Sequence, residues 1–129
     1  MTDALSGARL LVVEDETLVA MMVEDILADL GCIVVAVAGS VERGLSIAND
    51  PQAALDAAVL DVNLGGEKVY PVAEALAAKG VPFVFATGYG VAGIAPRFSH
   101  VPALAKPYEQ RALEAALTAV LEDTRSTGA

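Results

Sequence analysis

The sequence predicts an α/β fold: a doubly wound five-stranded parallel sheet with helices on both faces. Five short apolar runs bounded by turn residues are typical of buried strands, and they cover residues 9–13, 33–38, 57–60, 82–87 and 101–105. Between these runs lie segments in which apolar residues recur at helical spacing. Strands that alternate with helices in this way favour a parallel sheet with right-handed crossovers.

Three helices are expected before residue 80. The first covers 16–30, and its apolar face consists of the residues at helical spacing, which are Leu18, Met22, Ile26 and Leu30. Ser40 is expected to cap the second helix, which ends before Asn49-Asp50-Pro51. The third is expected over about 69–79, with Pro71 in its first turn.

Two further helices are expected in the last third of the chain. A short helix after the loop Gly88-Tyr89-Gly90 is expected to end near Pro96. The final helix has Pro107 in its first turn, and its apolar face consists of Leu113, Leu117, Val120 and Leu121. The folded domain is therefore expected over 9–123, between tails at 1–8 and 124–129.

The composition fits one compact domain. At 129 residues the chain is long enough for a single core and too short for two. The net charge of -9 opposes binding to nucleic acid and anionic membranes, and it favours a metal cation or a partner with a basic face. The lone Cys32 excludes an internal disulfide and is expected to be buried. Neither a signal peptide nor a membrane span is visible, so a cytoplasmic location is expected.

Polar side chains follow four of the predicted strands, namely Glu14 and Asp15, Asp61, Thr87 and Lys106. Because the carboxyl ends of parallel strands meet at one edge of a sheet, these side chains are expected to converge. Three crowded carboxylates repel one another unless a cation neutralises them, and an oxygen-rich site of this kind suits Mg²⁺. With an ammonium and a hydroxyl added, the set is suited to hold a phosphoryl group, with Asp61 as its covalent acceptor.

This set of residues resembles the site of the response-regulator receiver domain of bacterial two-component signalling. The resemblance covers nearly the whole chain and rests on Glu14-Asp15, Asp61, Thr87 and the Lys106-Pro107 pair. It implies a flavodoxin-like fold with strand order 2-1-3-4-5, and a regulatory phosphoacceptor domain rather than an enzyme.

The resemblance also implies a role for each site residue. Asp61 would accept phosphate from a phosphohistidine on a sensor histidine kinase or a phosphotransfer protein. The implied Mg²⁺ ligands are Asp15, Asp61 and the backbone carbonyl of Asn63, with Glu14 assisting. Thr87 and Lys106 would bind the phosphoryl oxygens.

Residues 82–89 further resemble the signature of the FATGUY subgroup, whose members are often stand-alone receivers partnered with HWE-type histidine kinases. Two positions depart from the wider family: Ala103 stands where an aromatic residue is usual, and Gly65-Gly66 stand where many members have a proline. Because the usual switch needs that aromatic ring, we expect Gly88-Tyr89-Gly90 to replace it, with Tyr89 moving between exposed and docked positions.

Two other functions fit parts of the sequence. The run from Gly88 to Gly93 matches the G-x-G-x-x-G pattern of dinucleotide-binding domains, but it follows the fourth strand, and Lys106 stands where an acid is needed. A phosphatase or phosphotransferase with Asp61 as nucleophile would use the same groups as a receiver. The receiver function is preferred, with output through a downstream protein partner or by draining phosphate from a shared kinase.

Overall fold

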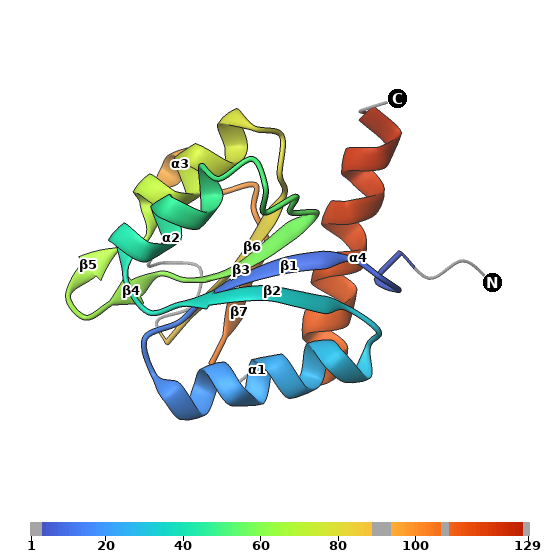
Figure 1. Ribbon diagram of the computed structural model, residues 1–129, viewed down its shortest axis with the longest axis horizontal. Helices are drawn as coiled ribbons and strands as arrows, with labels where there is room; N and C mark the ends of the chain where they lie inside the picture. The colour runs from blue at the N-terminus through green and yellow to red at the C-terminus, as the bar shows by residue number, and fades with distance from the viewer. Residues whose placement is uncertain (1–3, 89–93, 107–108, 128–129) are drawn as a thin grey trace.

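The computed structural model describes residues 4–88, 94–106 and 109–127. Five parallel strands form one sheet in the order β2-β1-β3-β6-β7 (Figure 1), which confirms the predicted fold and strand order. The strands are β1 (Arg9–Val13), β2 (Ile33–Ala38), β3 (Ala57–Asp61), β6 (Phe83–Thr87) and β7 (Ala103–Ala105). The helices are α1 (Thr17–Asp29), α2 (Val41–Ala48), α3 (Tyr70–Ala78), α4 (Gln110–Thr127) and the short 3₁₀ helix η2 (Pro96–Phe98).

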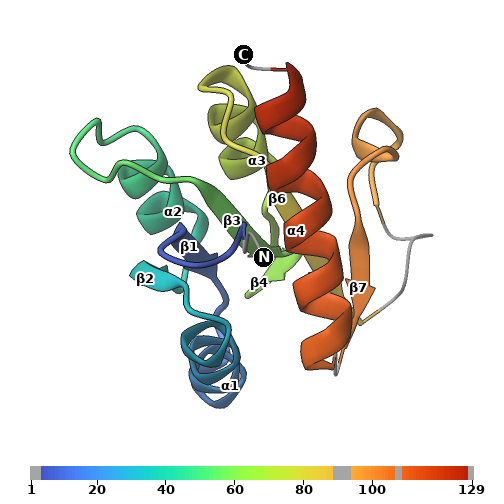
Figure 2. The same cartoon turned by 90° about the vertical axis from the view of Figure 1, so that its right-hand side faces the viewer.

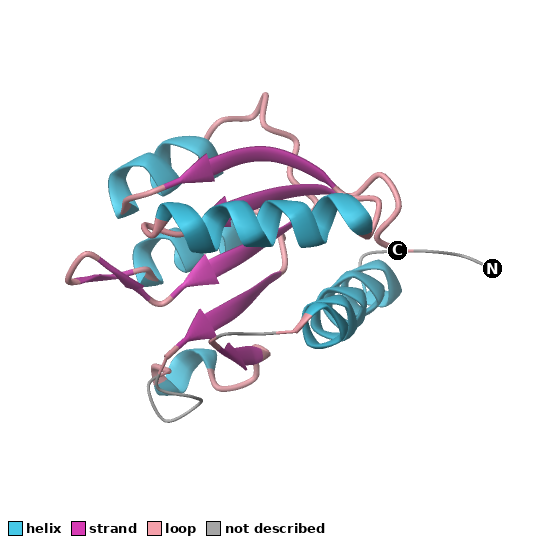
Figure 3. Ribbon diagram, turned by 90° about the horizontal axis from the view of Figure 1, so that it is seen from below, coloured by secondary structure: helices cyan, strands magenta, loops and turns pink. Residues whose placement is uncertain are grey.

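The sheet separates two apolar cores. One core contains side chains of α2 and α3, the other contains side chains of α1 and α4, and the helices lie on opposite sides of the strands accordingly (Figures 1 and 2). Figure 3 views the sheet from the side of α1, which lies in front of the strands. Alternate residues of β1 enter opposite cores, Leu11 and Val13 on one side and Leu10 and Val12 on the other. Burial on both faces explains why the central strands β1, β3 and β6 are almost entirely apolar.

Several local predictions are confirmed. The Ser40 hydroxyl caps α2 by accepting a hydrogen bond from the Arg43 amide at 3.1 Å. Pro71 lies in the first turn of α3, and Cys32 is buried. Within the described residues, no helix combines the length and the apolar character that crossing a membrane requires.

The expected apolar face of α1 is wrong at Leu18 and Met22, whereas Ile26 and Leu30 are partly buried and pack against the core as expected. The buried residues of this helix are Ala20, Val23 and Leu27, whereas the Leu18 side chain is 81% exposed and Met22 is also exposed. Residues 18–23 are all apolar, so spacing alone does not define one stripe, and contact with the sheet selects the face with the small Ala20. Leu18, Met21 and Met22 therefore form an exposed apolar patch on α1, called the α1 patch below.

The described parts of both expected tails, residues 4–8 and 124–127, belong to the core or to regular structure. Ala4, Leu5 and Ala8 are buried beside α1 and α4, so residues 4–8 do not form a free tail. Helix α4 continues to Thr127, beyond the expected end at 123. It begins at Gln110, later than expected, and Pro107 lies outside the described residues.

Two features between the strands also differ from expectation. Pro96 begins η2, because its fixed φ suits a first helical position, and most of the helix expected before it lies outside the described residues. The loop after β3 is a hairpin of β4 (Asn63–Leu64) and β5 (Glu67–Lys68), and Gly65 and Gly66 supply the two positive φ angles that its turn requires. Tyr89 and Gly90 of the expected switch loop lie outside the described residues.

Candidate functional site

The predicted carboxylates, hydroxyl and ammonium lie at the carboxyl ends of strands. Glu14 and Asp15 follow β1, Asp61 ends β3, Thr87 ends β6, and Lys106 follows β7. The strand register aligns these ends, since Asp61 pairs with Ala86 and Thr87 pairs with Ala105. The structure therefore brings the predicted residues to one edge of the sheet, as the topology requires.

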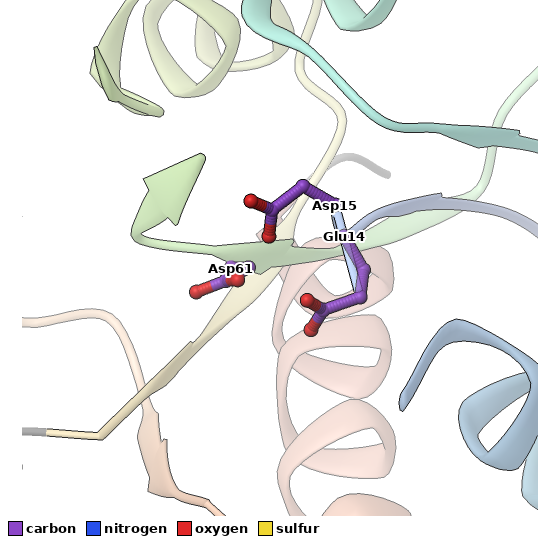
Figure 4. Close-up of side chains that lie close together, drawn as sticks. All are labelled: Glu14, Asp15 and Asp61. Atoms are coloured by element: carbon purple, nitrogen blue, oxygen red, sulfur yellow. The ribbon is translucent and has the colours of Figure 1, made fainter. Parts of the chain in front are cut away.

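Three carboxylates converge at this edge (Figure 4). Ligand oxygens of Glu14, Asp15 and Asp61 all lie within 4.8 Å of one another. Glu14 is only 4% exposed and Asp61 only 5%, whereas Asp15 is exposed to solvent. The acids thus form a partly covered, oxygen-rich site with one open side.

Lys106 neutralises part of this charge. Its ammonium nitrogen lies 2.9 Å from Asp61 Oδ2 and 2.9 Å from Glu14 Oε1. Three ionised carboxylates and one ammonium leave two negative charges at the site, which a single divalent cation would balance. The oxygen donors and this charge fit Mg²⁺, which takes few direct carboxylates and keeps several waters.

Backbone amides hold the carboxylates in place. The Glu16 amide donates to Glu14 Oε2 at 3.1 Å, and the Asn63 amide donates to Asp61 Oδ1 at 3.2 Å. The Gly65 amide donates to Asp15 Oδ2 at 2.9 Å, so the β4–β5 hairpin is bound directly to the acidic site. Sequence reasoning missed this tie because nothing in a pair of glycines indicates which side chain their amides contact.

Lys68 is a second residue that sequence reasoning missed. Its ammonium donates to the Asn63 side-chain oxygen at 2.6 Å, across the pair that joins β4 and β5. The bond fixes the Asn63 side chain, while the direction of the Asn63 carbonyl stays a prediction. The only signal in the sequence is the spacing of Asn63 and Lys68 on either side of a turn. That spacing indicates a contact only once the hairpin is known.

Comparison with known proteins identifies the family. The profile of the response regulator receiver domain matches residues 10–118. The chain belongs to the response regulator receiver domain family. Comparison with curated protein sequences gave no match.

Solved structures of receiver domains resemble this one over nearly the whole chain. The solution structure of SdrG from Sphingomonas melonis Fr1 is 45% identical, covers 94% of this chain and 99% of its own, and gives a TM-score of 0.79. The BeF3-activated conformation of SdrG from Pseudomonas melonis Fr1 has the same identity and coverage, with a TM-score of 0.75. A receiver protein from Sinorhizobium medicae shares the fold at 22% identity, covering 93% of this chain and 98% of its own with a TM-score of 0.75.

Burial and charge shift two pKa values in this receiver domain. Burial raises the pKa of Glu14 to about 6, against the opposing effect of its bonds with Lys106 and the Glu16 amide. Burial disfavours the charged form of Lys106, but its hydrogen bonds to Glu14 and Asp61 outweigh that effect and raise the pKa of the ammonium above its ordinary value. Lys106 therefore remains a cation, whereas Glu14 takes up a proton in mildly acidic solution.

We expect Mg²⁺ binding to weaken as the pH falls through about 6, because the cation must compete with the proton on Glu14. The raised pKa sets the direction: Glu14 is ionised well above pH 6 and protonated well below it. Isothermal titration with Mg²⁺ at several pH values should show this step in the natural protein. The step should be absent in Glu14→Gln, and an identical step in that variant would show that another group is responsible.

Of the remaining predicted residues, the structure describes Thr87, Gly88 and Ala103, whereas Tyr89 and Gly90 lie outside the described residues. Thr87 is buried at the end of β6, and the Lys106 amide donates to its carbonyl at 3.0 Å. Gly88 is exposed and follows directly. Ala103 pairs with Phe85 in the sheet, so the position that usually carries an aromatic ring lies beside the aromatic side chain of β6.

Proposed function

We propose that this receiver domain is a response regulator that accepts a phosphoryl group on Asp61 from a sensor histidine kinase or a phosphotransfer protein in an Mg²⁺-dependent reaction. One observation carries the proposal: the Asp61 carboxylate lies at the open edge of the sheet, 2.9 Å from Lys106 and beside two further acids. A carboxylate in this setting has both a cation and a neighbouring metal-binding group available for phosphoryl transfer.

The chemistry follows from these groups. An Asp61 oxygen would attack the phosphorus of a phosphohistidine, forming the acyl phosphate bond while the P–N bond breaks and the electron pair returns to the imidazole. Lys106 is within reach of an oxygen on a phosphoryl group attached to Asp61, and the Thr87 hydroxyl would donate to another. When bound by Glu14, Asp15, Asp61 and the Asn63 carbonyl, Mg²⁺ would neutralise charge on the phosphoryl oxygens.

The likeness to SdrG supports this proposal. The two chains are 45% identical over nearly their whole lengths, and SdrG has a BeF3-activated conformation. Beryllofluoride on a carboxylate has the shape and charge of a bound phosphoryl group. We therefore propose that beryllofluoride and Mg²⁺ also act on Asp61 of this chain.

Incubation with radiolabelled acetyl phosphate tests the proposed reaction. Label should appear with Mg²⁺, disappear when EDTA is present, and be released by hydroxylamine, which cleaves acyl phosphates. Continuous release of phosphate from p-nitrophenyl phosphate would instead indicate an Asp-nucleophile phosphatase. Absence of label with every donor would overturn the proposed function.

We propose that the phosphodonor docks on the α1 patch. Helix α1 begins two residues after Asp15, and Leu18, Met21 and Met22 expose their apolar side chains near the acceptor site.

The donor is a sensor histidine kinase, of the HWE type that the FATGUY-like signature indicates. We place the reaction in the cytoplasm, because the ATP that charges such kinases is there. Output is proposed to follow through a downstream protein or through removal of phosphate from the kinase.

The variant Leu18→Ser with Met22→Ser should slow phosphotransfer from the phosphorylated kinase by about tenfold, because it removes apolar contact area near the centre of the interface. Transfer from acetyl phosphate should be unchanged, since that donor needs no docking surface. Ile33→Ser is the matched control, because Ile33 is also exposed but starts β2 at the opposite edge of the sheet. Equal kinase rates for the double variant and the control would place the docking surface elsewhere.

A further inference from the structure

All three phenylalanines of the chain pack together with one tyrosine. Phe83 and Phe85 are on β6, Phe98 is in η2, and Tyr70 begins α3. The Tyr70 ring stacks on Phe98 at 5.6 Å between centroids, and it meets the Phe85 ring edge-on at 6.0 Å. Phe85 and Phe98 are also edge-on, at 5.7 Å. This aromatic cluster joins α3, β6 and the segment that follows β6.

Polar contacts on the outer side of the cluster join the same elements. The Ala95 amide donates to the Tyr70 hydroxyl at 2.9 Å. The Arg97 guanidinium lies 5.3 Å from the centre of the Tyr70 ring and 5.1 Å from that of Phe98. It also pairs with Glu74 of α3 at 2.8 Å, with both side chains 56% exposed. We call this set the aromatic latch; it consists of Tyr70, Glu74, Ala95, Arg97 and Phe98.

The aromatic latch contacts the same part of the core as Ala103, the position where an aromatic ring is missing. Ala103 pairs in register with Phe85, so their side chains project from the same face of the sheet. Both belong to the core that contains Phe98 and against which Tyr70 packs. Rings from α3 and η2 therefore surround Phe85, and β7 contributes only a methyl group.

The aromatic latch is also connected to both halves of the acceptor site. Phe85 is two residues before Thr87 on β6, so the two side chains project from the same face of the strand. Tyr70 follows the β4–β5 hairpin, which is bound to Asp15 through the Gly65 amide and closed by a bond from the Val69 amide to the Val62 carbonyl at 2.9 Å. Thr87 is therefore joined to the latch through Phe85, whose ring meets that of Tyr70, and the hairpin is joined to it through the chain that leads into Tyr70.

We propose that the aromatic latch opens when Asp61 is phosphorylated. This opening takes the place of the switching movement of the aromatic residue that is absent at position 103. The inference rests on the proposed function. A phosphoryl group would draw Thr87 and Lys106 toward its oxygens and shift the end of β6. Because the close-packed rings around Phe85 do not deform continuously, the polar contacts outside them give way first: the part-buried Tyr70–Ala95 hydrogen bond and the exposed Arg97–Glu74 pair.

Thermodynamic reciprocity gives the sign of the test. If phosphorylation favours the open latch by some factor, then the open latch must favour the phosphorylated state by the same factor. A substitution that weakens the closed latch should therefore make phosphorylation more favourable. Tyr70→Phe removes the hydrogen bond from the Ala95 amide and keeps the ring, so it should bind beryllofluoride with Mg²⁺ about two- to tenfold more tightly than the natural protein. Arg97→Gln should act in the same direction and remains informative if Tyr70→Phe does not fold. Lys79→Gln, which removes a positive charge just past the far end of α3, should leave the affinity unchanged.

Amide hydrogen exchange provides a direct readout. In the natural protein, the Ala95 amide should exchange faster when beryllofluoride and Mg²⁺ are added, and in Tyr70→Phe it should exchange fast from the start. Unchanged affinity in Tyr70→Phe and Arg97→Gln, with the natural protein still binding beryllofluoride, would overturn the latch and leave the proposed function intact. If the natural protein does not respond to beryllofluoride at all, both the latch and the proposed function are wrong.

Discussion

Asp61→Asn should take no phosphoryl label from acetyl phosphate or from a phosphorylated kinase in the presence of Mg²⁺. The substitution keeps the size of the side chain but removes the nucleophilic oxygen that attacks phosphorus. It also removes one of the two carboxylates that pair with Lys106. Counting radiolabel on gel-purified protein should therefore give a loss to background, the largest effect expected of any single substitution in this domain.

Asp29→Asn is the control for this experiment, because Asp29 is an exposed acid at the end of α1 and should label normally. A thermal melt of both variants establishes that each is folded. Persistent labelling of folded Asp61→Asn would mean that another side chain accepts the phosphoryl group.

In a titration at about pH 7.5, Asp15→Asn should bind Mg²⁺ at least about tenfold more weakly than the natural protein. Glu14→Gln should lose less Mg²⁺ affinity than Asp15→Asn. The structure explains the difference between the two acids. Asp15 is exposed, and its one bond in the site is accepted from the Gly65 amide, whereas Glu14 is buried and paired with Lys106. Asp15 thus has the more available oxygen for a hydrated cation.

The asparagine amide oxygen in Asp15→Asn still accepts the Gly65 hydrogen bond, so the hairpin should stay in place. Glu16→Gln removes a neighbouring exposed charge and serves as the control for general electrostatics. Unchanged Mg²⁺ affinity in Asp15→Asn would restrict the role of Asp15 to anchoring the β4–β5 hairpin.

The fold and the composition of the site were predictable because both depend on features that a sequence carries directly. Apolar runs buried on both faces require a parallel sheet, and a parallel sheet gathers its carboxyl ends at one edge. Asp61, Thr87 and Lys106 had only to be placed at the ends of the correct strands. No knowledge of side-chain conformation was needed for that step.

The features that were missed depend on tertiary contact. The stretch 18–23 is apolar on all sides, so only packing against the sheet selects Ala20 and Val23 for burial and leaves Leu18 exposed. The bond from the Gly65 amide to Asp15 joins residues fifty positions apart, and the contact of Tyr70 with Ala95 joins residues twenty-five apart. No local pattern in the sequence predicts either of these contacts. The proposed role of Tyr89 stays a prediction, since that residue lies outside the described part of the chain.

Chemical mapping of the phosphorylated residue tests the central claim most directly. Borohydride reduces an aspartyl phosphate to homoserine, so the modified residue can be located by peptide mass spectrometry after reaction with acetyl phosphate and Mg²⁺. We predict homoserine at position 61 and at no other acid, and its loss when EDTA is present. Reduction at Glu14 or Asp15, or reduction at Asp61 that is as strong with EDTA as with Mg²⁺, would contradict the proposed reaction.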